Sequence, residues 1–271
     1  PYIPATMQLN DLTDARTNNI KETIYIGSGA GGATVADSSV GIGYLALSTS
    51  TSGVNNVALG SRALRFNTSG SDNIAIGRLA LANNDAGSSN IAFGSLTLVS
   101  NITGNRNTAI GFSALFNNQG SDNVANGHNA LYQNTIGVRN IAVGSASLQK
   151  NNSGSNNIGI GFEAINSNTL GNGNIGLGYR ALDANAIGFY NIAIGFNANV
   201  SSSNLSNAIA IGHNANVQFS DAIRLGNANI SYASINVPWS VTSDRRRKEN
   251  IRTMPLGLEF VKDLRPVIYH Q

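Results

Sequence analysis

Ser243 and Lys248 are the strongest candidates for catalytic residues in this sequence. Ser243 precedes a charged run from Asp244 through Arg252, and Lys248 follows the serine by five residues. A serine hydroxyl becomes a nucleophile when a nearby lysine, its pKa lowered by desolvation, takes the proton. Two other interpretations stay open, since the run could be a solvated helix start capped by Ser243 or a basic patch for nucleic acid.

The other candidates for catalysis or metal binding are isolated. His128 and His213 each follow a glycine by one residue, with no recurring carboxylate beside them. The Gly-rich segment 29–32 lacks the Gly-Lys-Ser/Thr ending of a phosphate loop. Asp72 and Asp122 lie in Ser-Asp-Asn turns and do not form the recurring pair that a glycosidase needs. We therefore predict no cofactor, no metal site and no turnover enzyme.

The composition limits the partners of the chain. Among 271 residues there are 30 Gly and 40 Asn, and only 11% are charged, against about 25% in ordinary globular domains. Residues 243–271 hold 7 Lys/Arg and 4 Asp/Glu, whereas the first 242 residues hold 10 of each, so the tail accounts for the net charge of +3. The body has no cluster of cations and no apolar run of about 18 residues, so we predict neither nucleic-acid binding nor membrane insertion.

A repeat of 17 residues makes up most of the chain and must position any functional residues within it. Its consensus is Asn-Ile-Ala-Ile-Gly-x-x-Ala-Leu, followed by about eight residues rich in Asn, Ser, Gly and Thr. The glycine recurs at positions 27, 43, 60, 77, 94, 111, 127, 144, 161, 178, 195, 212 and 226. Glycine tolerates positive φ, so we assign a turn to this position. The best-defined turn glycines are Gly60, Gly77, Gly94, Gly111, Gly144, Gly161, Gly178 and Gly195.

Each repeat contains a short strand with two unlike faces. The residues one and three before the glycine are large and apolar, as in Ile74 and Ile76, and the residue between them is small, as in Ala75. We expect the bulky face to enter a core and the small face to meet another layer of backbone. The Ala-Leu pair after the glycine predicts a second short strand. Because one such unit cannot bury its apolar face alone, the copies must stack.

The predicted fold is all-β: a parallel β-solenoid or β-roll of about twelve 17-residue repeats, with a short mixed C-terminal segment. We divide the chain into an N-terminal connector (1–22), the repeat array (23–230), a neck (231–242) and a C-terminal segment (243–271). The array departs from its pattern at the 16-residue interval before Gly127, which contains Asn126 and predicts a bulge or a missing turn residue. It changes again where Asn199 and Asn216 replace the anchor leucine.

An asparagine four residues before the glycine predicts a ladder of stacked amides, a structural feature and not a ligand site. Its members are Asn56, Asn73, Asn90, Asn107, Asn123, Asn140, Asn157, Asn174 and Asn191.

The repeat resembles the head domains of trimeric autotransporter adhesins and the matching segments of phage tail fibres. The segments 73–77, Asn-Ile-Ala-Ile-Gly, and 206–212, Ser-Asn-Ala-Ile-Ala-Ile-Gly, carry this resemblance. It implies a left-handed parallel β-roll assembled as a homotrimer, although the unit of the adhesins is shorter than 17 residues.

The C-terminal segment resembles the start of the endosialidase-type intramolecular chaperone domain, which follows the fibre of phage tail spikes. The residues in common are Ser243 to Ile251, except Arg247, where the family commonly has Leu, and then Leu264 to Val267. The resemblance implies that Ser243 is the nucleophile and Lys248 its general base, in a single self-cleavage between Thr242 and Ser243. In that family the domain trimerises the chains before it is released; here only 29 residues follow the cut.

We therefore expect a structural and adhesive fibre protein of a phage or virus tail, located on the virion and acting outside the host cell. Its partners would be two further copies of itself and a host surface glycan or protein. The alternatives are an adhesin on a cell surface and, in a different class, a glycan-degrading tail spike.

Overall fold

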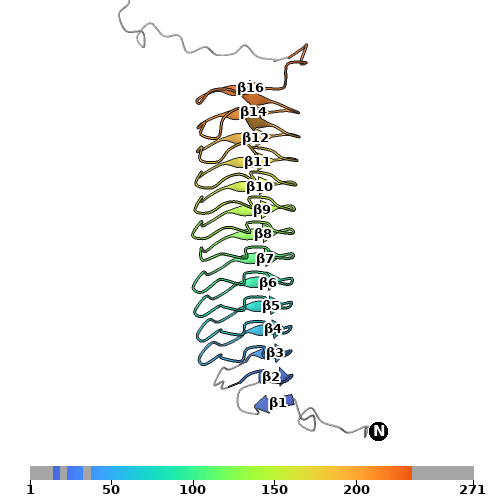
Figure 1. Cartoon of the computed structure of the whole chain (residues 1–271), viewed down its shortest axis with the longest axis vertical. Helices are drawn as coiled ribbons and strands as arrows, with labels where there is room; N and C mark the ends of the chain where they lie inside the picture. The colour runs from blue at the N-terminus through green and yellow to red at the C-terminus, as the bar shows by residue number, and fades with distance from the viewer. Residues whose placement is uncertain (1–14, 19–22, 33–37, 234–271) are drawn as a thin grey trace, which may run out of the picture. The chain divides into compact units, whose positions relative to one another are not determined.

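The computed structural model describes residues 15–18, 23–32 and 38–233, and these residues contain strands and turns but no helix. The chain divides into two compact units, Pro1–Ile230 and Ser231–Gln271. The first unit is a parallel β-solenoid of about twelve turns with a repeat of about 17 residues (Figure 1). The predicted all-β solenoid is confirmed.

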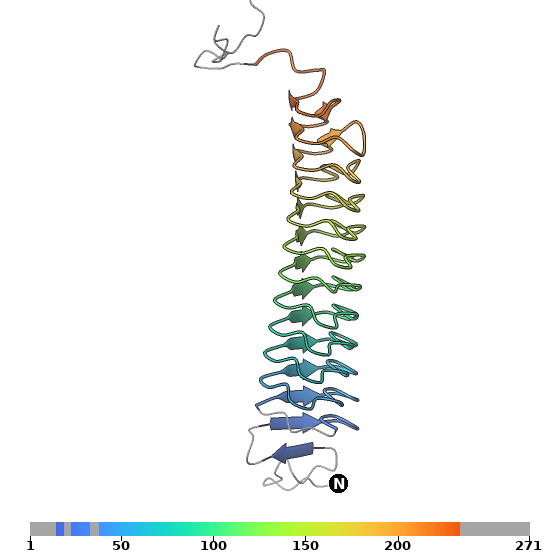
Figure 2. The same cartoon turned by 90° about the vertical axis from the view of Figure 1, so that its left-hand side faces the viewer.

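Most turns contribute one strand of three residues, and these strands stack into a single sheet (Figure 2). Every pair from β2 onward is parallel and in register, so that Ile74 lies beside Ile91 and Ala75 beside Ala92. β1 lies within the predicted connector and pairs antiparallel with β2. The strands of this sheet are β1 (Ala15–Asn18), β2 (Thr23–Ile26), β3 (Val40–Ile42), β4 (Val57–Leu59), β5 (Ile74–Ile76), β6 (Ile91–Phe93), β7 (Thr108–Ile110), β8 (Val124–Asn126), β9 (Ile141–Val143), β10 (Ile158–Ile160), β11 (Ile175–Leu177), β12 (Ile192–Ile194), β14 (Ile209–Ile211) and β16 (Ile223–Leu225).

The predicted second strand is wrong for most turns. The anchor leucine takes a left-handed conformation, with φ of 47° at Leu64 and 51° at Leu81, and that conformation bends the chain. A second strand forms only near the C-terminal end, in β13 (Asn199–Val200) and β15 (Asn216–Val217), which pair with each other. There asparagine replaces leucine and does not take positive φ. The expected change of character near this end is therefore confirmed.

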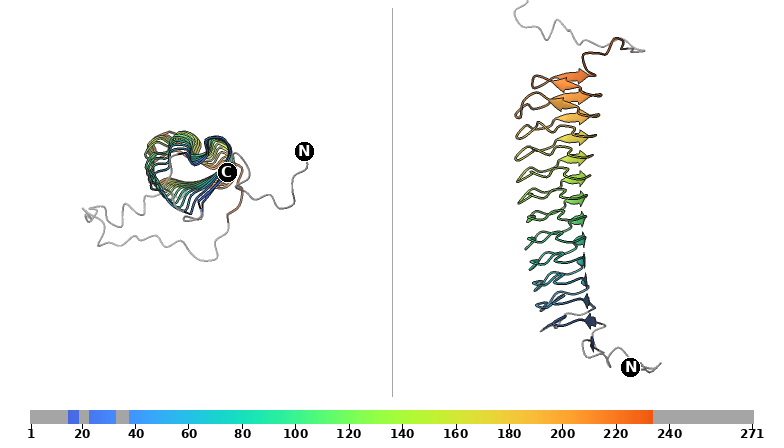
Figure 3. Two further views of the ribbon diagram at one scale, coloured as in Figure 1. Left: turned by 90° about the horizontal axis from the view of Figure 1, so that it is seen from below. Right: turned by 45° about the vertical axis from the view of Figure 1, so that its right-hand side comes forward.

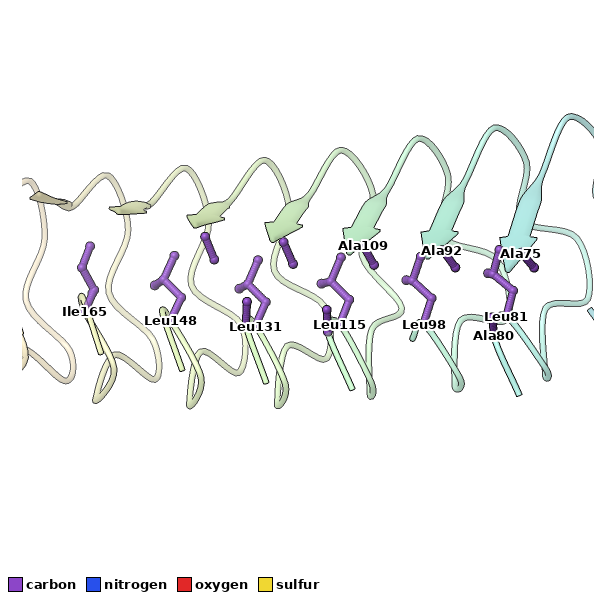
Figure 4. Close-up of a cluster of buried hydrophobic side chains, with 14 of the residues drawn as sticks. Ala75, Ala80, Leu81, Ala92, Leu98, Ala109, Leu115, Leu131, Leu148 and Ile165 are labelled. Atoms are coloured by element: carbon purple, nitrogen blue, oxygen red, sulfur yellow. The ribbon is translucent and has the colours of Figure 1, made fainter. Parts of the chain in front are cut away.

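The core is lined by the small face of each strand. Ala75, Ala92 and Ala109 are fully buried, and they face the column of anchor side chains that includes Leu81 and Leu98 (Figure 4). Our expectation that the bulky face enters a core is wrong for the single chain. The turns are narrow and lie over one another in the view along the solenoid axis (Figure 3), so the interior has room for one leucine opposite one alanine.

Three turns carry glycine at the place of the strand alanine, and each compensates for a larger side chain in the turn before. At Gly41 that side chain is Tyr25, whose Cδ1 would lie 2.9 Å from an added Cβ. Ser147 stands where most turns have alanine, and a Cβ on Gly159 would lie 2.6 Å from its Oγ. Ile165 stands where most turns have leucine, and a Cβ on Gly176 would lie 2.6 Å from its Cγ1. Glycine in place of alanine therefore offsets the larger side chain of the turn before, and the packing density of the core stays the same.

The repeat glycine is required for two reasons. Gly77 has a φ of 132°, which side chains rarely tolerate. A Cβ at this residue would also lie 2.4 Å from the carbonyl oxygen of Gly94 in the next turn. The predicted turn at this position is confirmed, and close stacking of the backbone adds a constraint of its own.

Candidate functional site

The outward face of the sheet is the most prominent surface feature of the described residues. The residues one and three before each repeat glycine form two columns along thirteen parallel strands, which are apolar except at Thr108 and Asn126. Ile141 is 37% exposed, Ile74 38% and Phe93 54%. With strands about 4.8 Å apart the face is roughly 58 Å long, and two columns about 6.6 Å apart give it an area on the order of 400 Å². That lies within the range of the largest apolar patch of a typical monomer, which is often functional.

Aromatic rings border parts of this face at the position after the repeat glycine, in one run at 112–128 and another at 162–213. Phe162 stacks on Tyr179 with ring centroids 5.5 Å apart, and Tyr179 stacks on Phe196 at 4.8 Å. His213 continues this run 5.6 Å beyond Phe196, and His128 stacks on a phenylalanine of its own preceding turn. Within the described residues no group of three His, Cys, Asp or Glu side chains could hold a metal ion. The two histidines thus belong to an aromatic surface.

The 16-residue repeat lacks one turn residue, which is one of the two outcomes that we expected there. Only Gln119 stands between Asn118 and Gly120, where the other long repeats have two residues. The Gln119 Oε1 accepts a hydrogen bond from the Ile102 N–H at 3.3 Å, and its Nε2 donates to the Ser100 carbonyl. The side-chain amide of Gln119 thus makes hydrogen bonds to the preceding turn like those that a backbone amide makes elsewhere in the solenoid. The expected alternative, a bulge in the strand, does not occur, because β8 keeps its register with both neighbours.

The predicted asparagine ladder is present, and all nine members are fully buried. The Oδ1 of Asn90 accepts from the backbone N–H of Asn107 at 3.0 Å and from its Nδ2 at 3.1 Å. The Nδ2 of Asn90 also donates to the carbonyl of Gly104 at 2.9 Å. Each amide therefore satisfies buried backbone groups as well as the next amide, which explains why no other side chain occupies these positions in the middle turns.

A second ladder runs beside the first and was missed in the sequence. Its members also donate to each other, as Asn84 does to Asn67 at 2.7 Å, and Asn84 shares the carbonyl of Gly87 with Asn73 of the first ladder. The signal that could have identified it is the same spacing seven residues after the repeat glycine. The members are Asn67, Asn84, Asn101, Asn118, Asn134, Asn151, Asn168 and Asn185.

A groove of about 660 Å³ crosses several turns on another side of the solenoid. Phe66, 42% exposed, lies in it together with Asn83, Asp85 and Ile102. The Thr68 hydroxyl donates a hydrogen bond to the Asp85 carboxylate. Asp85 is the one carboxylate that lines this groove, whereas glycoside hydrolysis normally uses two. The groove thus combines an apolar ring with polar groups that can bind a ligand.

The strongest charge interaction of the described surface joins Arg106 and Asp122. Two guanidinium nitrogens donate to the two carboxylate oxygens at 2.6 and 3.0 Å. This hydrogen bond lowers the pKa of Asp122 below its usual value. Because the folded pKa lies below the unfolded one, the associated stability is present at neutral pH and is lost as the pH falls through the lowered pKa. Both groups are at the surface, so the contribution is small.

The candidate catalytic residues Ser243 and Lys248, with Thr242 before the proposed cut, lie outside the described residues. In the part of the chain that is described, no helix is long and apolar enough to cross a membrane. Comparison with protein-family models and with curated proteins finds no match to this sequence.

Proposed function

We propose that the chain is a rod segment of a phage or virus tail fibre, in which three copies associate through their outward sheet faces. The fibre is part of the virion and acts outside the host cell. The observation that carries the proposal is the apolar face, which continues over thirteen parallel strands. A second copy would remove this surface from water, and apolar burial is the main driving force of association. The resemblance of the repeat to fibre and adhesin segments supports the number three.

The mass of the purified chain in native buffer tests this proposal. One chain weighs 28.2 kDa, so light scattering coupled to gel filtration should give about 85 kDa for three copies. A mass of one chain would reject self-association. A mass of two or four chains would agree with self-association through the sheet face but would reject the threefold arrangement.

The C-terminal segment adds a maturation step to the proposal. Lys248 takes the proton of the Ser243 hydroxyl, whose oxygen attacks the carbonyl carbon of Thr242 and forms an ester with it. The Thr242–Ser243 peptide bond breaks, and its nitrogen leaves as the Ser243 amine with the proton that Lys248 returns. Water then hydrolyses the resulting ester, so the reaction occurs once per chain. Expression of the full-length gene should give a cleaved product, and Ser243→Ala and Lys248→Ala should each leave one uncleaved band. Equal processing of the three proteins would reject the dyad.

The groove beside Phe66 is our candidate site for a host surface glycan. Sugars bind to proteins through an apolar face against a ring and through hydroxyls that bond amides and carboxylates, and the groove offers both kinds of group. Binding of the rod to host cell-surface polysaccharide should weaken at least about tenfold in Phe66→Ala, by loss of ring contacts. Phe219→Ala, which changes an exposed ring elsewhere on the solenoid, is the control. Equal binding of both variants would exclude this site.

A further inference from the structure

We propose that Asn126 sets the axial register in which copies of this chain associate. The inference rests on the proposed self-association through the sheet face and concerns how the copies are aligned along the rod. The partner is a second copy of the chain, and the site is the middle of the apolar face.

Asn126 is the one polar side chain in its column among the described residues. It pairs with Ile110 of β7 and Val143 of β9, and its own strand is regular. The side chain is exposed, and its amide forms no hydrogen bond within the described part of the chain. The other members of the column are Ile26, Ile42, Leu59, Ile76, Phe93, Ile110, Val143, Ile160, Leu177, Ile194, Ile211 and Leu225.

A periodic face cannot fix its own alignment. Each turn presents nearly the same two apolar side chains, so a shift by one turn, about 4.8 Å, places isoleucine against isoleucine again. Only the contacts of the last turns at each end are lost in such a shift. Apolar packing along this rod therefore distinguishes weakly between the aligned assembly and the shifted ones.

Asn126 makes the aligned assembly more favourable than the shifted ones. When parallel copies are aligned, each Asn126 faces the Asn126 of its neighbours, and an amide both donates and accepts hydrogen bonds. After a shift of one turn it faces Ile110 or Val143 of a neighbour, and the amide is buried without a partner, which is unfavourable. A single buried asparagine sets the register of coiled coils by the same principle.

The place of Asn126 strengthens this role. It lies on the seventh of the thirteen parallel strands, so a shift toward either end meets the same penalty. Thr108 in the neighbouring column and His128 after the repeat glycine lie on adjoining positions. Within the two columns of the face, Thr108 and Asn126 are the two polar members among the described residues, and both lie near the middle.

The test moves the asparagine without changing the composition. In the exchanged chain, Asn126→Ile is combined with Ile194→Asn, which places the asparagine four strands away in the same column. Affinity-tagged wild-type chain is co-expressed with an untagged partner, and the untagged chain recovered with the tag is measured. The exchanged chain should be recovered about tenfold less than untagged wild type, because mixed assemblies leave amides unpaired or lose the contacts of four turns. Untagged Ile194→Val, which leaves Asn126 in place, should be recovered like wild type.

Each result decides the question. Recovery of the exchanged chain equal to that of wild type would overturn the role of Asn126 while leaving self-association intact. If no untagged wild type is recovered with the tagged chain, and the tagged chain has the mass of one chain, the proposed assembly itself would be rejected. If the exchanged chain does not fold, the opposite exchange, Asn126→Leu with Leu59→Asn, moves the asparagine four strands toward the N-terminus and gives the same comparison.

Discussion

At the scale of single residues, the core of the solenoid is matched turn by turn. Leu81 and Ala92 show the ordinary combination, a leucine in one turn and an alanine in the strand of the next. Where isoleucine replaces leucine at 165, glycine replaces alanine at 176. The β-branched side chain places a methylene where the alanine Cβ would lie. A Cβ at 176 would also lie 2.8 Å from the carbonyl oxygen of Ala181. Glycine at 176 is therefore set by these two contacts and not by its φ, which is not positive.

The pair Ile165 and Gly176 gives a prediction about stability. Gly176→Ala should lower the free energy of unfolding by about 1–3 kcal/mol, because its Cβ overpacks the core against Ile165. In the Ile165→Leu background the same change should be close to neutral, as it restores the ordinary combination. Thermal unfolding of the four proteins of this double-mutant cycle measures the coupling. Additive effects, with no rescue by leucine, would contradict the explanation.

At the scale of the elements, the turns are held together by buried amides as much as by strands. The two asparagine ladders converge on one glycine carbonyl in each turn, as Asn73 and Asn84 do on Gly87. Three-residue strands offer few ladder hydrogen bonds of their own. Backbone bonds between the bends of successive turns, such as that from the Leu64 N–H to the Ala80 carbonyl at 3.0 Å, add to them. The buried amides supply further bonds in the interior, where water cannot replace them.

Asn90→Ala tests the ladder. The substitution removes the acceptor of the Asn107 N–H and one donor to Gly104, so the free energy of unfolding should fall by about 1–3 kcal/mol. Asn83→Ala is the matched control, since Asn83 is exposed and should change stability by less than about 0.5 kcal/mol. Chemical denaturation monitored by circular dichroism measures both. Similar losses in the two variants would show that the ladder has no special contribution.

At the scale of the whole solenoid, the outward face of the sheet is available for assembly because it does not contribute to the core of the single chain. The interior is closed by alanine and leucine, so the outward isoleucines are not required for the core of one chain. Their repetition over the length of the rod makes sense if another surface covers them. Self-association and its register are therefore properties of this face.

Ile141→Lys should separate folding from assembly. Ile141 lies near the middle of the face and is 37% exposed, so a lysine can extend into solvent in a single chain. In an assembly the charge would be buried, and the mass should fall from three chains to one with the β-sheet spectrum unchanged. Thr103→Lys, in an exposed turn, should keep the mass of the wild type. Unchanged mass in both variants would show that this face is not the interface.

Residue spacing is enough to predict the repeat, the stacking of its copies, the turn glycine and the first asparagine ladder, because identical residues at equal intervals come into register in any stack. Which strand face lies inside is known only from the folded chain. Alternation of large and small residues leaves both orientations open until the width of a turn is known. The structure also shows that Leu64 bends the chain. The sequence does not predict this bend, because leucine is not a residue type that commonly takes positive φ. The pairing of Gly176 with Ile165 followed in the same way, because contact between turns depends on how the side chains pack in space.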